Sequence, residues 1–280
     1  MSDINCRMPA VALRGLVCLP DMILHFDVSR KKSIAALEAA MVKDQMVFLV
    51  AQKDPDEEDP KQEDLYTAGA MAKVKQIVKM PENMVRVVAE GKFRAELDEM
   101  ISVSPYLLTD VIIHDREEKV ENENEAEAMR RVLEEIVQKF IDAGAKFGPE
   151  ITRQMEQAED IVKLTNQLCA NMPMRWQDRQ TLAEKMDFRE RYEELCRIME
   201  KEYDVLLINQ DIQNKVKSRL EKNQRDYVLR EQMKLIREEL GDDMQSEIDE
   251  YEKKLEELKA PDVVKEKLEK EISRFKASAG

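Results

Sequence analysis

The residues that could carry out chemistry are few and scattered in this sequence of 280 residues. Neither histidine, His25 or His114, has a serine or cysteine nearby in the pattern of a nucleophilic triad. The sequence contains no GxxxxGK[ST] phosphate loop and no GxSxG turn. Acidic residues are abundant, but no pair of them stands out as a general acid and base. We therefore assign no catalytic and no cofactor-binding residue.

The cysteines show neither a disulfide framework nor a metal-binding pattern. They are widely spaced, and two histidines are too few to complete a zinc site with them. Scattered cysteines are typical of a reducing compartment, and the sequence has neither a signal-peptide core nor an apolar run of membrane-spanning length. We expect a soluble, cytoplasmic protein with no metal site and no membrane contact. The cysteines are Cys6, Cys18, Cys169 and Cys196.

The charge distribution disfavours binding to nucleic acid, and the most acidic stretch has the composition of a surface loop. The formal net charge is -14, which opposes binding to a polyanion. A basic run between Lys215 and Arg225 is interleaved with acids, so we interpret it as the solvated face of a helix. The stretch from Lys53 to Asp64 is acidic and contains two prolines. A metal site is conceivable there, but the pattern favours a mobile surface loop.

Residues 1–116 are predicted to form a β-rich domain. Alternating apolar residues indicate strands, a short helix is expected at 33–42, and Pro81-Glu82-Asn83 predicts a hairpin turn. Gly91 is expected to mark a bulge or a bend. The result would be a curled antiparallel sheet or partial barrel within an α+β fold. The expected strands are 11–19, 22–28, 45–51, 68–79, 84–97 and 103–114.

Helices are predicted for the remainder of the chain. Residues 117–186 show helical spacing in several short segments, which favours a compact bundle. Residues 187–241 predict one very long helix, with Asp187 as its N-cap and Gly241 at its end. Residues 242–280 are highly charged, and their two narrow apolar stripes predict a helical hairpin arm. Periodicity alone leaves the long helix open as a coiled-coil spacer or as a neck that joins a globular front end to other machinery.

Several of these segments together resemble one protein family. Residues 221–241, EKNQRDYVLREQMKLIREELG, closely resemble the neck helix of bacterial Lon proteases. Residues 9–22 resemble the opening strands of that family, and 33–40 resemble its first helix. Arg94 follows Glu90-Gly91 as in the family's central hairpin. The resemblance covers essentially the whole sequence, with departures at Cys18 and His25.

The resemblance implies a homohexameric, ATP-dependent endopeptidase with a Ser-Lys dyad that acts in protein quality control and the stress response. It implies that this sequence is the substrate-recognition and assembly region, inactive alone, and that ATP and Mg²⁺ bind an ATPase module that would follow it. The expected partners are unfolded or degron-bearing proteins and other copies of the chain. The alternative is a stand-alone coiled-coil adaptor.

Two sets of residues follow from this interpretation as hypotheses. The sequence contains 17 methionines, most of which we expect in cores, but Met80 and Met84 flank the predicted hairpin turn and should be exposed. Together with Met22 they are the candidates for contact with unfolded polypeptide. The candidates for assembly along the neck are Tyr203, Ile212, Val216, Leu220, Tyr227 and Met233.

Overall fold

The chain forms two compact units, Met1–Leu207 and Ile208–Gly280. The computed structural model describes residues 3–81, 83–115, 118–145, 153 and 157–279. For 237–246 and 277–279 it describes the backbone alone. The sequence also predicts a helix from Pro149 through Met155, and of these residues only Arg153 is described.

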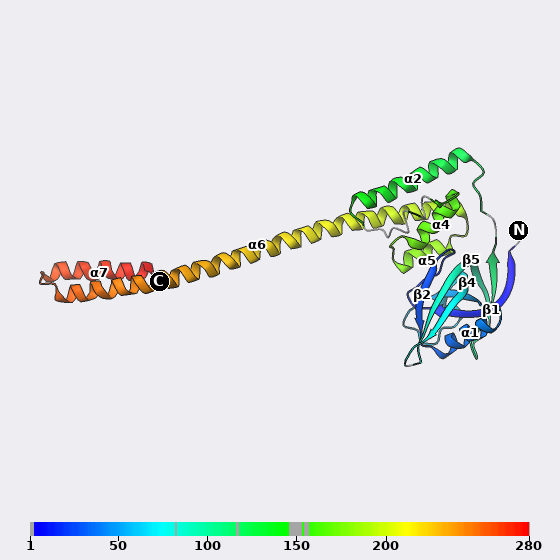
Figure 1. The fold of residues 1–280 in the computed structure, drawn as a ribbon, viewed down its shortest axis with the longest axis horizontal. Coiled ribbons are helices and arrows are strands. Elements are labelled where there is room, and N and C mark those ends of the chain that lie inside the picture. The colour runs from blue at the N-terminus through cyan, green and yellow to red at the C-terminus, as the bar shows by residue number, and fades with distance from the viewer. Residues whose placement is uncertain (1–2, 82, 116–117, 146–152, 154–156, 280) are drawn as a thin grey trace. The chain divides into compact units, whose positions relative to one another are not determined.

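The first unit opens with a six-stranded sheet that curls into a partial barrel, as predicted (Figure 1). The strand order is β2-β5-β4-β3-β1-β6. β5 also pairs with β6, so the part of the sheet that runs from β5 to β6 is joined at its two ends. The strands are β1 (Ile4–Leu13), β2 (Ile23–Val28), β3 (Met46–Gln52), β4 (Leu65–Lys79), β5 (Val85–Ser102) and β6 (Leu107–His114).

One pair in the sheet is parallel, which the prediction of an antiparallel sheet missed. β1 and β3 run in the same direction because β2 and helix α1 (Lys31–Val42) form a crossover between them. The predicted first strand, 11–19, was also wrong in its bounds. β1 starts earlier and ends at Leu13, because Gly15 adopts a φ of 63° that turns the chain out of the strand.

Alternation along the strands builds two cores on opposite faces of the sheet. Met8, Ala10 and Ala12 of β1 belong to one core with residues of β3, β5 and β6. Val11 and Leu13 of the same strand belong to the other, which α1 and β2 cover. This period of two is the pattern from which the strands were predicted.

Gly91 marks a bulge, as expected, and also a close approach between chain segments. Met71 pairs with Phe93 while Ala72 pairs with Gly91, so that Lys92 is the extra residue in β5. The Gly91 amide donates to the Met22 carbonyl at 2.9 Å. A Cβ on Gly91 would lie 2.0 Å from the Leu19 carbonyl oxygen, which leaves room only for glycine.

The acidic loop was predicted to be mobile, but many hydrogen bonds anchor it. The fully buried Gln52 donates through Nε2 to the carbonyls of Asp54 and Glu57, at 3.2 and 2.9 Å. Arg14 also donates to the Glu57 carbonyl, and Lys32 pairs with Asp59 at 2.5 Å. The acidic composition correctly indicated a surface segment, but it did not indicate that a buried glutamine would hydrogen-bond to this segment.

The second part of the first unit is a helical bundle, also as predicted. It contains α2 (Glu123–Asp142), α4 (Ile161–Asn171), α5 (Trp176–Glu184) and the start of α6 (Figure 1). Asn122 and Asp160 cap α2 and α4, and Gly144, with a φ of 77°, follows the end of α2. The core of the bundle includes Leu133, Leu164, Leu182 and Leu195, and it extends to Val17 and Ala68 of the β-rich part.

Helix α6 (Phe188–Glu257) begins as predicted and ends later than predicted. Asp187 caps it by accepting from the amides of Arg189 and Glu190 at 2.8 and 3.1 Å. The predicted end at Gly241 was wrong, because the helix continues through this residue. A single glycine inside a helix costs only about 1 kcal/mol, which a long helix can absorb.

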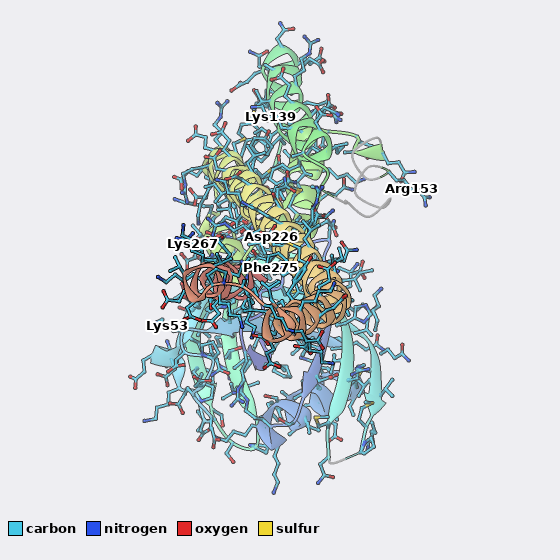
Figure 2. All side chains as sticks on the ribbon, turned by 90° about the vertical axis from the view of Figure 1, so that its left-hand side faces the viewer. Lys53, Lys139, Arg153, Asp226, Lys267 and Phe275 are labelled. Atoms are coloured by element: carbon cyan, nitrogen blue, oxygen red, sulfur yellow. The ribbon has the colours of Figure 1, made fainter. Side chains whose placement is uncertain are left out.

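The hairpin arm is present, but it forms at the end of this same helix. In the second unit α7 (Asp262–Ala279) runs back beside the last turns of α6, and Lys276 forms an ion pair with Glu252. Figure 2, where Lys267 and Phe275 mark α7, shows the two helices side by side. Ile248, 2% exposed, lies on the α6 side of this pair.

Candidate functional site

Two of the three methionines predicted to contact unfolded polypeptide, Met80 and Met84, lie at the tip of the β4–β5 hairpin. The Met80 amide donates to the Met84 carbonyl at 2.8 Å, and Asn83 adopts a φ of 56° in the turn. Both side chains are half-buried, so they are less exposed than predicted. Val78, at 40% exposure, adds an apolar side chain near this tip.

Met22 lies in a different part of the sheet from the hairpin tip. It is half-buried and contacts two of the cores, and its carbonyl accepts from Gly91. Met84 precedes Gly91 by seven residues of one strand, which corresponds to roughly 23 Å. The structure therefore brings Met80 and Met84 together and leaves Met22 apart, next to Ile23, which is 63% exposed. Sequence reasoning missed Ile23 as an exposed apolar residue, although it alternates with the buried Leu24.

The neck candidates do not all have the same environment. Ile212, Val216 and Leu220 are 51%, 51% and 63% exposed on α6. Tyr227 and Met233 are 65% and 55% exposed further along the helix. These five residues lie in the second unit and form an apolar stripe along α6, which also exposes Val228, Leu229, Leu235 and Ile236 there.

Tyr203 belongs to the bundle and lies apart from this stripe. It is half-buried, and its ring packs edge-on against Phe140 of α2 with 5.5 Å between the ring centroids. Tyr203 therefore contributes to the bundle core at the start of α6, and the other neck candidates do not share this environment.

One buried arginine connects the sheet to the bundle, and a second binds the segment between α5 and α6 within the bundle. Arg94 of β5 donates through Nη1 to the Leu182 carbonyl at 3.1 Å, near the end of α5. Arg191 of α6 donates to the Lys185 and Met186 carbonyls at 3.0 and 3.2 Å, just after α5. Helix ends leave carbonyls without intrahelical donors, and these guanidinium groups supply the donors. The sequence signal for Arg94 was its place after Glu90-Gly91, but nothing in the sequence showed what it binds.

The charges of the two arginines are only partly compensated. Arg191 is fully buried and forms a salt bridge with Glu118. Burial, together with repulsion from Arg191, lowers the pKa of Arg94 to about 10, so it still carries its charge at neutral pH.

Beside Arg94 a polar cleft of about 920 Å³ opens between the sheet and the bundle. The loop before β2, the bulge of β5 and the end of β6 form one side of it. The segment that leads into α2, part of α4 and the first turn of α6 form the other. Its lining includes Arg94, Asn166, and the acidic residues Asp21, Asp115 and Glu121.

The cysteines and histidines form no reactive centre in the described part of the chain. All four cysteines are free thiols, and burial raises the pKa of Cys18 to about 12 and that of Cys169 to about 11. His25 is exposed, and His114 lies between Asp3 and Glu96, at 3.2 and 3.0 Å. Among the described residues, no three metal-ligating side chains are grouped to hold an ion. Over the same residues, no helix is long and apolar enough to cross a membrane.

Comparison with known proteins identifies the family. Residues 7–201 match the model for the ATP-dependent protease La (LON) substrate-binding domain. The chain belongs to this family. It is 43% identical to a Lon protease from Lachnoclostridium phytofermentans over 100% of this chain and 35% of that protein. It is 39% identical to one from Brevibacillus choshinensis over 96% of this chain and 34% of that protein.

The fold is also similar to that of a solved LON domain. The N-terminal domain of a Mycobacterium avium complex Lon protease matches 70% of this chain and 98% of its own length, with a TM-score of 0.53 at 16% identity. The chain spans about a third of the length of the curated relatives named above. Those relatives are proteases, and neither of them is an adaptor protein.

Proposed function

We propose that this chain is the non-catalytic substrate-recognition and assembly region of an ATP-dependent protease that degrades misfolded and regulatory proteins. The observation that supports this most directly is the match of residues 7–201 to the LON substrate-binding domain. In this proposal 1–116 recognises substrates with the bundle of 117–186, 187–241 forms the neck, and 242–280 leads to the ATPase module. ATP, Mg²⁺ and the Ser-Lys dyad belong to modules that follow this region, in a cytoplasmic hexamer.

The hairpin tip is the proposed contact for unfolded polypeptide. Met80 and Met84 are partly accessible, and methionine adapts its shape to varied apolar partners. A protein that recognises misfolded chains has no single sequence to match, so an adaptable apolar contact suits it. Met22 with its neighbour Ile23 is a second, separate contact in this proposal.

The stripe from Ile212 to Met233 is the proposed site of self-association. Its side chains are about half exposed or more, whereas single-chain proteins bury most side chains that recur on one helical face. Association would bring several recognition domains together and would raise their effective concentration for a substrate that contacts more than one.

The test of recognition measures fluorescence anisotropy of one labelled protein, folded and chemically unfolded, titrated with this chain. We expect selective binding of the unfolded form, weakened several-fold by Met80→Ser with Met84→Ser. The matched control is Val132→Ser with Ile141→Ser, which changes two exposed apolar residues of α2, 44% and 41% exposed. Equal affinity of the wild type and the methionine variant would refute the assignment of the hairpin tip.

A further inference from the structure

Over the described residues, the wall of the cleft contains two polar groups without a hydrogen-bond partner. Arg94 is 7% exposed, and its Nη2 has no partner among the described residues, although Nη1 is bound to α5. Oδ1 of Asn166 on α4 is also buried without a partner in the described part of the chain. Both residues line the cleft. Native proteins avoid buried groups of this kind unless something else satisfies them.

The two groups have complementary requirements. Arg94 Nη2 can only donate a hydrogen bond, whereas Asn166 Oδ1 can only accept one. A carboxylate would satisfy the arginine alone, and an ammonium group would satisfy the asparagine alone. A peptide group or a primary amide carries a carbonyl and an N–H together and can therefore satisfy both.

The charges around the cleft favour a cationic ligand. Several of its ionised groups form ion pairs: Glu118 with Arg191, Arg189 with Glu125, and Lys92 with Glu90. His114 lies between the carboxylates of Asp3 and Glu96. Four carboxylates of the lining have no ion-pair partner among the described residues, and over the same residues the lining cations without one are Lys119 and Arg94. The four carboxylates are Asp21, Asp115, Glu121 and Asp187, of which Asp187 accepts hydrogen bonds from the first amides of α6.

The volume of the cleft fits a short length of polypeptide. At about 920 Å³ it lies near the upper end of the roughly 300–1,000 Å³ range of small-molecule sites. Its polar lining is better matched to backbone and polar side chains than to an apolar cluster.

We propose that this cleft binds an extended, basic polypeptide segment, one of whose amide groups bridges Arg94 Nη2 and Asn166 Oδ1. This inference rests on the proposed function and names a second class of substrate segment, recognised apart from the apolar contact at the hairpin tip. Bound at both sites, an unfolded chain would be held by its polar basic stretches as well as by its apolar ones.

The test uses the 280-residue chain and a fluorescein-labelled short peptide of glycine, serine and glutamine with two lysines. An otherwise identical peptide carries two glutamates instead. Asn166→Ala should weaken binding of the lysine peptide roughly five- to tenfold, the value of one to two hydrogen bonds. Its thermal midpoint should be unchanged or raised, because the substitution removes a buried acceptor that is unsatisfied in the free protein.

Gln167→Ala is the matched control. Gln167 also has a buried side-chain oxygen with no hydrogen-bond partner in the part of the chain that the structure describes, but it does not line the cleft. The Gln167→Ala variant should therefore bind the lysine peptide with the same affinity as the wild type. A second comparison, Asp21→Asn with Glu121→Gln, should reduce the preference for the lysine peptide over the glutamate peptide.

The inference is overturned if the wild type binds neither peptide, if Asn166→Ala binds as tightly as Gln167→Ala, or if the glutamate peptide binds as well as the lysine peptide. The Met80→Ser, Met84→Ser variant separates the two proposals. Loss of unfolded-protein binding in that variant, with no effect of Asn166→Ala on the peptide, would leave the proposed function intact and refute the cleft.

Discussion

Replacing Gly91 with alanine should destabilise the first unit far more than a single methyl group ordinarily does. The added Cβ would lie 2.0 Å from the Leu19 carbonyl oxygen and 2.8 Å from its carbonyl carbon. These are backbone atoms, so relief requires a shift of the chain, whereas a side chain could rotate away. The same shift would break the hydrogen bonds that Gly91 makes with Asp21 and Met22.

The magnitude follows from these two effects. Forcing an extra methyl group into a packed site costs about 1–3 kcal/mol, and two lost hydrogen bonds cost about 1 kcal/mol each. The sum is about 3–5 kcal/mol. For a unit of this size 1 kcal/mol corresponds to roughly 2–4 °C, so the thermal midpoint should fall by roughly 6–20 °C.

The assay is thermal unfolding followed by circular dichroism or calorimetry, with Gly144→Ala as the control. Gly144 has a positive φ of 77°, but no atom lies within 4 Å of the position that a Cβ would take there. Its substitution should cost only the backbone strain, about 1 kcal/mol or a few degrees. If Gly91→Ala unfolds within a few degrees of Gly144→Ala, the close approach is not what requires glycine at this position.

Two other predictions concern the neck and a surface ion pair. Changing Ile212, Val216 and Leu220 together to serine should reduce self-association in a concentration series by sedimentation velocity without altering unfolding of the first unit, and unchanged association would refute the stripe as the contact. Arg86 lowers the pKa of Asp27 through a hydrogen bond at 2.8 Å, so this pair stabilises the fold above the ordinary aspartate pKa of 3.8 and loses its effect as pH falls through the lowered value. Arg86→Gln should therefore raise the Asp27 pKa toward 3.8 in an NMR titration, and an unmoved pKa would show that Arg86 is not the cause.

Local pattern was sufficient to predict most elements of the fold. The alternation in β2 and the spacing in α2 and α4 reflect burial of one face, which is a property of neighbouring residues. The cap at Asp187 is equally local. The end of α6 was not predictable in this way, because a glycine favours a helix end without enforcing one. The continuation through Gly241 depends on the long helix to either side of it.

The candidate site depends on contacts between distant parts of the chain, and these were not visible in the sequence. Arg94 meets the end of α5, 88 residues later, and Asn166 shares a cleft with it. Neither residue has a sequence environment that marks it as buried and unpartnered. The methionines were found because flexible apolar residues beside a turn are unusual, but their degree of burial depends on the neighbouring strands.

The arginine contacts also determine which parts of this chain could be exchanged with another protein. The β-rich part ends near His114, and a designer would naturally choose that point as the boundary of a transplantable module. A graft of that part alone would leave the Arg94 guanidinium without the Leu182 carbonyl, and the Ala68 carbonyl without the amide of Gln180. The smallest piece that carries its own hydrogen-bond partners across this interface therefore includes the bundle, through the first turns of α6.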